Sequence, residues 1–189
     1  MVNTDKKNFV RILGPCSVQS EDVYLGTAEK LYPIMKGKDW YYKASFDKAN
    51  RTSIYGGRGP GLEDSIRLFK EVKKLYPDIK LTTDVHEPWQ CDKLAGIIDL
   101  VQIPAFLCKQ TDLIIASAQN FDKMNIKKGQ WLGPQNLIKS VDKGAISASF
   151  IKRRTVPSSS NVFFLDILSL LVLILKMQNI FWFCLVVIN

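Results

Sequence analysis

The stretch WYYKASFDKANR (residues 40–51) places an apolar, aromatic run directly before a crowd of charged and amide side chains. A solvated surface strand would alternate apolar and polar residues, whereas here the charges gather where a strand gives way to a loop. Lys43, Lys48 and Arg51 beside Asn50 suit a compact anion such as a phosphate or a carboxylate. A plain basic surface loop is the alternative. We favour the anion site because polar clusters also follow four other predicted strands.

Outward from this strand, short apolar runs alternate with helical patterns along most of the chain. Gly14-Pro15 stops the first strand, and Ser20 can cap the helix behind it. The predicted strands are residues 9–13, 40–45, 79–84, 98–103 and 122–126. The predicted helices are one that begins after Ser20, followed by residues 62–76, 89–95, 111–119 and 134–143.

Strands that alternate with helices predict a parallel sheet, and functional side chains gathered after successive strands are typical of a (β/α)8 barrel. The polar groups that follow the five strands are Cys16, residues 43–51, residues 84–87, Gln102 with Lys109, and residues 127–130. A doubly wound sheet would bind its ligand at one switch point, and the sequence contains no GxGxxG or Walker motif. We predict an α/β fold of the TIM-barrel family that contains about the first five βα units.

The composition fits one domain of 189 residues with a net charge of +8. The sequence contains no long run of lysine and arginine that would indicate a nucleic-acid partner. The four cysteines are scattered without a CxxC pair, which fits a reducing cytosol rather than a disulfide framework. The first ten residues lack the apolar segment of a secretory signal peptide, so we expect a cytoplasmic protein.

The pattern changes near Gly144. We divide the chain into a partial barrel domain (residues 1–143), a Ser-rich and basic linker (144–161) and a hydrophobic tail (162–189). The tail does not resemble a sixth βα unit, so we expect two unpaired sheet edges. We consider three interpretations of the tail: a membrane anchor, an element that covers the open side of the partial barrel, and a sequence unrelated to the rest, which we favour.

Six strings carry a family resemblance: GPCSVQSED (14–22), KASFDKANR (43–51), RGPGLE (58–63), TDVHEPWQ (83–90), QIPAFLCKQTDL (102–113) and NIKKGQ (125–130). Together they closely resemble the 3-deoxy-manno-octulosonate-8-phosphate synthase family over about residues 9–143. GPCS also occurs in the related 3-deoxy-arabino-heptulosonate-7-phosphate synthases, which are the alternative. KASFDKANR and PAFLCKQTDL favour the octulosonate enzymes.

The resemblance implies a transferase, a 3-deoxy-8-phosphooctulonate synthase, that condenses phosphoenolpyruvate, D-arabinose 5-phosphate and water. The products would be 3-deoxy-D-manno-octulosonate 8-phosphate and phosphate, in lipopolysaccharide (KDO) biosynthesis. Such enzymes are cytosolic homotetramers. Further alternatives are a non-catalytic truncated isoform and a tail-anchored membrane protein, and we expect negligible turnover from the chain alone.

The resemblance also assigns roles to individual residues. The implied catalytic residues are Lys48, Lys128 and Asp84. The implied substrate-binding residues are Lys43, Ser45, Asn50, Arg51, Ser53, Gln102, Pro104, Ala105, Lys109 and Gln130. Lys109 stands where the family usually carries an arginine that reaches into a neighbouring subunit, so we expect weaker aldose binding.

Cys16 stands where the metal-dependent branch of the family carries its cysteine ligand. The implied cofactor is a divalent ion of zinc, iron, manganese or cobalt. The remaining ligands of the family, a His, a Glu and an Asp, come from later strands beyond the end of the resemblance. His86 is the single histidine of the chain, and we do not expect it to be the ligand.

Overall fold

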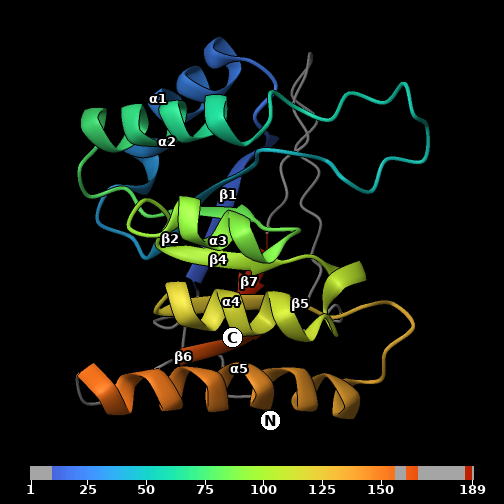
Figure 1. Cartoon of the computed structure of the whole chain (residues 1–189). Coiled ribbons are helices and arrows are strands. Elements are labelled where there is room, and N and C mark those ends of the chain that lie inside the picture. The colour runs from blue at the N-terminus through green and yellow to red at the C-terminus, as the bar shows by residue number, and fades with distance from the viewer. Residues whose placement is uncertain (1–9, 156–160, 166–185, 189) are drawn as a thin grey trace, which may run out of the picture.

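The computed structural model describes residues 10–155, 161–165 and 186–188 of the chain. Strands and helices alternate strictly from the first strand to the fifth long helix, and Figure 1 shows the helices stacked beside the strands. This pattern confirms the predicted α/β fold, with parallel strands and intervening helices as in part of a TIM barrel.

Most element bounds lie close to the predicted ones, and the exceptions are the first strand and the last helix, which are both longer than predicted. The strands are β1 (Val10–Ser17), β2 (Trp40–Ser45), β3 (Leu81–Asp84), β4 (Leu100–Ile103), β5 (Lys123–Lys127), β6 (Asn161–Leu165) and β7 (Val186–Ile188). The helices are α1 (Glu21–Met35), α2 (Leu62–Leu75), α3 (Pro88–Leu94), α4 (Thr111–Asn120) and α5 (Pro134–Thr155), with a short 3-10 helix, η2 (Ala105–Leu107). Ser20 caps α1 as predicted, since its hydroxyl accepts a hydrogen bond from the Val23 amide.

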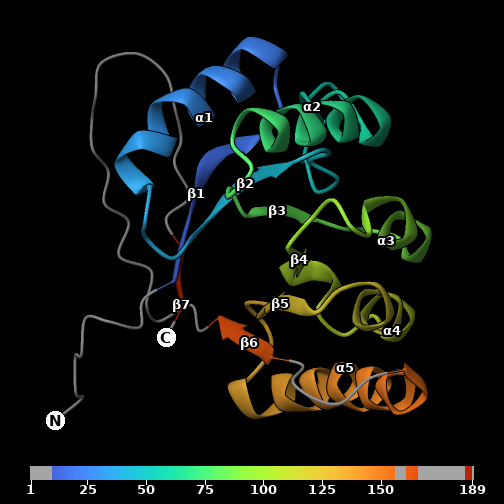
Figure 2. The same ribbon diagram turned by 90° about the vertical axis from the view of Figure 1, so that its left-hand side faces the viewer.

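The strands β1 to β5 lie side by side in chain order, and each neighbouring pair is parallel. Figure 2 shows the five helices arranged along one side of this curved sheet, which we call its outer face. Side chains alternate between the two faces of a strand. Tyr42 therefore faces the helices, whereas Tyr41 and Lys43 face the opposite side, the inner face.

The hydrophobic core lies between the outer face and the helices. The rings of Tyr24 in α1 and Tyr42 in β2 have centroids 5.1 Å apart, and Phe69 of α2 meets Tyr24 at 5.7 Å. The Tyr42 hydroxyl donates a hydrogen bond to the Tyr24 carbonyl oxygen at 2.6 Å. Each fully buried aromatic side chain contributes about 2 kcal/mol. This packing holds α1 and α2 on β2 and leaves its inner face to polar residues.

A close backbone contact explains the course of β1. A Cβ atom at Gly14 would lie 2.0 Å from the carbonyl oxygen of Lys43, so only glycine lets the two strands approach here. The register between β1 and β2 shifts between Leu13 and Cys16, and Cys16 has a left-handed φ of 65°. Because of this bulge, β1 does not stop at Gly14-Pro15 as we predicted but continues to Ser17, and Cys16 is turned toward the loop that follows β2.

The part after Gly144 differs from the expectation. α5 continues to Thr155, so residues 144–155 of the predicted linker are helical. β6 pairs in parallel with β5, and β7 pairs antiparallel with β1. Short segments of the tail therefore supply strand partners to β5 and β1, where we expected the unpaired edges, and the outermost strands of the described sheet are β6 and β7. The three-part division of the chain stays a prediction.

Most of the hydrophobic tail, residues 166–185 with Asn189, lies outside the described residues. Within the described part, no helix combines the length and the apolar character that a membrane crossing requires. The membrane-anchor reading concerns the tail and stays a prediction.

Candidate functional site

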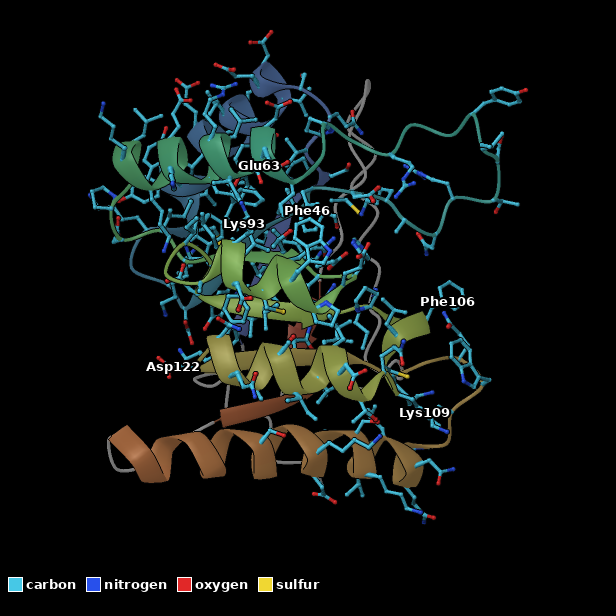
Figure 3. The ribbon with its side chains drawn as sticks, in the orientation of Figure 1. Phe46, Glu63, Lys93, Phe106, Lys109 and Asp122 are labelled. Carbon is cyan, nitrogen blue, oxygen red and sulfur yellow. The ribbon has the colours of Figure 1, made fainter. Side chains whose placement is uncertain are left out.

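Polar side chains meet on the inner face of the sheet. We name them the inner cluster, which consists of Lys43, Ser45, Lys48, Asp84 and Gln102. The cluster lies where β2, β3 and β4 end. In Figure 3, Phe106 and Lys109, which follow β4, lie at this end of the sheet, and Asp122, which precedes β5, lies at the other. Ligand sites of βα barrels occupy the carboxyl ends of the strands.

Asp84 is the negative charge of the inner cluster. Its Oδ2 accepts a hydrogen bond from Ser45 Oγ at 2.7 Å, and its Oδ1 lies 3.0 Å from Lys43 Nζ. Lys43 is 6% exposed and Ser45 is fully buried. A buried lysine next to a partly buried carboxylate is tolerated because each charge has a partner and further hydrogen bonds.

The environment keeps Asp84 ionised. Burial by itself would raise the pKa of Asp84, but the charge of Lys43, the hydrogen bond from Ser45 and the charge of Lys48 together bring the pKa well below its ordinary value. One carboxylate therefore faces two ammonium groups at neutral pH. The inner cluster retains positive charge, which suits an anionic ligand.

Lys48 brings the loop after β2 into the cluster. Its Nζ donates to Ser45 Oγ at 3.1 Å and to Cys16 Sγ at 3.1 Å. Lys43 Nζ donates to the same Ser45 oxygen at 3.2 Å. The Ser45 hydroxyl thus uses its one donor and both of its acceptor positions, and it holds two ammonium groups beside each other.

Gln102 extends the cluster toward β5. Its Nε2 donates to Asp84 Oδ1, and its Oε1 accepts from Asn125 Nδ2 at 3.0 Å. We did not predict Asn125. The signal was available in the sequence, because Asn125 lies between the apolar residues Met124 and Ile126 of a predicted strand and is the first residue of the family string NIKKGQ.

The base of the loop after β2 is closed by three contacts. The guanidinium of Arg58 pairs with the carboxylate of Asp47 through two hydrogen bonds. The backbone N–H of Lys48 donates to the carbonyl oxygen of Arg58 at 2.7 Å, and that of Gly61 donates to Phe46 at 3.2 Å. The loop base therefore fixes the point from which the Lys48 side chain reaches the cluster.

The predicted aldose-binding residues lie farther along this loop. Asn50, Arg51 and Ser53 are exposed, and Arg51 Nε donates to the Gly57 carbonyl oxygen at 3.1 Å. The side-chain hydrogen bonds of Arg51 and Ser53 stay within the loop. The structure therefore does not join them to the inner cluster, and their roles stay predictions.

The predicted residues after β4 and β5 also stay outside the hydrogen-bonded cluster. Lys128 Nζ donates to the carbonyl oxygens of Gly129 at 3.2 Å and Leu132 at 3.0 Å, both in its own loop. Gln130 and Lys109 are exposed, whereas Pro104 and Ala105 are half-buried. Lys48, Arg51 and Lys128 all follow the carboxyl ends of strands, but no hydrogen bond or ion pair among the described residues links the three.

The described residues do not complete the implied metal site. They contain no group of three or more His, Cys, Asp and Glu side chains placed to hold an ion. The sulfur of Cys16 accepts a hydrogen bond from the Lys48 ammonium group, a cation that competes with a metal for the same sulfur. One thiol in this setting does not fit a divalent ion, and no step below depends on one.

His86 lies beside the cluster. Its ring meets the Phe46 ring edge-on at 5.4 Å, and its buried Nδ1 has no hydrogen-bond partner among the described residues. Burial lowers the pKa of His86 from its ordinary value of 6.5. The carboxylates of Asp84 and Asp47 oppose this shift, and the charges of Arg58 and Lys43 add to it.

We expect this histidine to make the protein less stable in mild acid. A base with a lowered folded-state pKa binds protons better in the unfolded state, so its contribution is fully present above about pH 6.5 and is lost as the pH falls below it. Thermal melting followed by circular dichroism at pH 7.5 and 5.5 should show a smaller drop for His86→Gln than for the wild type. Equal drops would contradict the assignment, because the chain has no other histidine.

Fold and site together define a protein of the βα-barrel class with two lysines and a carboxylate gathered at the carboxyl ends of parallel strands. Residues 1–165 match the DAHP synthetase I family. The chain is 47% identical over 134 residues to the 2-dehydro-3-deoxyphosphooctonate aldolase of Fusobacterium nucleatum, a match that covers 70% of this chain and 48% of that protein. The chain belongs to the DAHP synthetase I family. The octonate name of this relative confirms the resemblance to the octulosonate enzymes.

Two further relatives carry the same name. The one from Campylobacter jejuni is 45% identical over 139 residues, which is 72% of this chain and 51% of the relative. The one from Wolinella succinogenes is 45% identical over 137 residues, 71% of this chain and 52% of the relative. The chain thus spans about half the length of the curated relatives it matches.

Proposed function

We propose that this chain acts in the condensation of phosphoenolpyruvate with D-arabinose 5-phosphate and water, which forms 3-deoxy-D-manno-octulosonate 8-phosphate and phosphate. A carbon–carbon bond forms between C3 of the enol phosphate and the aldehyde carbon, water adds at C2, and phosphate leaves. Three relatives named for this product support the proposal. The observation that carries it is the pair of ammonium groups on the hydroxyl of Ser45, beside an ionised Asp84.

The inner cluster suits the enol phosphate better than a neutral ligand. Phosphoenolpyruvate brings a phosphate and a carboxylate, and Lys43 and Lys48 provide two adjacent positive charges. Asp84 lies between Lys43 and Gln102, where it aligns these side chains for the substrate. We assign phosphoenolpyruvate to this end of the sheet and the aldose to the loop that carries Arg51.

The proposal extends to the setting of the reaction. It places the chain in the cytoplasm and in lipopolysaccharide biosynthesis, within a homotetramer of the family type. Lys109 is exposed at the same end of the sheet as the inner cluster, a position from which it can serve a neighbouring subunit (Figure 3). The ammonium of Lys109 lacks the planar fork of an arginine, so the aldose phosphate would be held less tightly.

Isothermal titration of the full chain with phosphoenolpyruvate tests the proposal. We expect a dissociation constant below about 1 mM, and added D-arabinose 5-phosphate should tighten binding more than D-erythrose 4-phosphate, the four-carbon substrate of the heptulosonate alternative. A phosphate-release assay with both substrates measures turnover, which we expect to be at least about 1000-fold below that of the Fusobacterium relative. Folded protein that does not bind phosphoenolpyruvate at about 10 mM would overturn the proposal, and a preference for erythrose 4-phosphate would favour the alternative.

A further inference from the structure

Asn125 connects β5 to the inner cluster from a fully buried position. It lies in the middle of β5, is 0% exposed, and pairs in register with Gln102 of β4. Its Nδ2 donates to Gln102 Oε1 at 3.0 Å. Residues in register on parallel strands project to the same face of the sheet. Asn125 pairs with Gln102, and Gln102 pairs with Asp84, whose side chain lies beside Lys43 on the inner face.

The bond from Asn125 favours one orientation of the Gln102 amide. With Oε1 occupied by Asn125, Gln102 presents Nε2 to Asp84 and donates to its Oδ1. Asp84 then accepts hydrogen bonds from Gln102 and Ser45 while it pairs with Lys43. The opposite orientation of the Gln102 amide would place a carbonyl oxygen against the carboxylate, which is repulsive.

Asn125 is costly for the fold alone. Its Oδ1 is buried and has no hydrogen-bond partner among the described residues. Leaving a buried carbonyl unpaired is unfavourable, and an apolar side chain of similar volume, such as leucine, would avoid this cost. An asparagine here is therefore explained better by the bond that it donates to Gln102 than by packing.

We propose that Asn125 is a positioning residue for the inner cluster. It orients Gln102, which holds Asp84, which in turn holds Lys43 and Ser45 at the site of the anion. The proposal rests on the proposed function for its effect on phosphoenolpyruvate. The hydrogen-bond relay itself, from β5 through β4 and β3 to β2, stands on the geometry.

The structure offers a matched control in Thr83. Its hydroxyl is also buried without a hydrogen-bond partner in the described part, but Thr83 lies next to Asp84 along β3 and so projects to the outer face. Thr83→Val removes a buried, unpaired polar atom without touching the relay. A purely structural effect of buried polar atoms would appear in both variants, whereas a positioning effect would appear at Asn125 alone.

The experiment compares Asn125→Leu with Thr83→Val in two measurements on the full chain. Nuclear magnetic resonance follows the Gln102 side-chain amide protons, which should exchange faster with solvent in Asn125→Leu because the Gln102 amide is no longer held. Calorimetric titration measures the affinity for phosphoenolpyruvate, which should fall about tenfold in Asn125→Leu and stay unchanged in Thr83→Val. Both variants should melt within a few degrees of the wild type.

The outcomes separate the two proposals. Unchanged Gln102 amide protons with unchanged phosphoenolpyruvate affinity in Asn125→Leu would overturn the positioning role. A wild type that does not bind phosphoenolpyruvate, together with altered Gln102 protons in Asn125→Leu, would overturn the proposed function and leave the relay standing. If Asn125→Leu does not fold, the isosteric Asn125→Asp decides by the same measurements. The carboxylate of Asn125→Asp would turn the Gln102 amide around and should weaken phosphoenolpyruvate binding about 100-fold. A wild-type affinity for phosphoenolpyruvate in Asn125→Asp would contradict the positioning role.

Discussion

A Lys48→Met variant is expected to bind phosphoenolpyruvate at least about 100-fold more weakly than the wild-type chain. The ammonium of Lys48 contacts a hydroxyl and a thiol, and it forms no ion pair with a carboxylate among the described residues. Its charge is therefore available to an incoming anion, whereas part of the charge of Lys43 is balanced by Asp84. Methionine keeps most of the apolar stem and removes only the charge. Isothermal titration at fixed ionic strength measures the loss.

A second lysine on the same face provides the control for this variant. Lys123 lies at the opposite end of β5 from the cluster, where its Nζ donates to the Tyr41 hydroxyl at 3.2 Å. Lys123→Met changes the net charge of the chain by the same amount, so a general electrostatic effect would appear in both variants. We expect the affinity to change less than about threefold. Equal losses in the two variants would show that the anion does not bind at the inner cluster.

Gly14→Ala is expected to lower the free energy of unfolding by at least about 3 kcal/mol, or to prevent folding. The new methyl group would lie 2.0 Å from the Lys43 carbonyl oxygen and 2.8 Å from the Lys43 carbonyl carbon. Both atoms belong to the backbone of a central strand and cannot move aside as a flexible side chain can. β1 and β2 would have to separate, and Lys43 would leave its place beside Asp84. Chemical denaturation monitored by tryptophan fluorescence measures the loss.

Gly26→Ala is the matched control for the strand glycine. Gly26 lies inside α1, and an added Cβ would meet no atom within 4 Å outside its own helix. Alanine has the higher helix propensity, so this variant should gain about 0.5–1 kcal/mol of stability. If the free energy of unfolding of Gly14→Ala instead lies within about 1 kcal/mol of the wild-type value, the close approach of β1 and β2 is contradicted.

Periodicity predicted the main elements because local patterns reflect burial. β2 has the predicted bounds, and α2 begins at Leu62 as predicted and ends one residue earlier. β1 was predicted too short because Gly14-Pro15 was interpreted as a stop. Only the neighbouring strand reveals that Gly14 allows contact with Lys43, since nothing in a local pattern distinguishes a glycine in a turn from one at a close backbone approach.

The candidate site divides in the same way. Lys43, Ser45, Lys48, Asp84 and Gln102 were named from the resemblance, and the structure brings these five together. Asn125 stood out in the sequence as a polar residue between two apolar ones, but it was missed because its partner Gln102 lies 23 residues away on another strand. The tail strands β6 and β7 were missed because β pairing is a long-range property that a hydrophobic run does not specify.

By itself, the sequence determined the α/β class, the order of the first five βα units and the chemical character of the candidate site. It did so because hydrophobic periodicity indicates which face of an element is buried, and clusters of charged residues indicate where strands end. Tertiary structure alone decided which polar groups touch: that Ser45 holds two lysines, that Cys16 meets Lys48, and that Asn125 orients Gln102. These contacts arise from strand register and from the bulge in β1, and both depend on how neighbouring strands fit together in space.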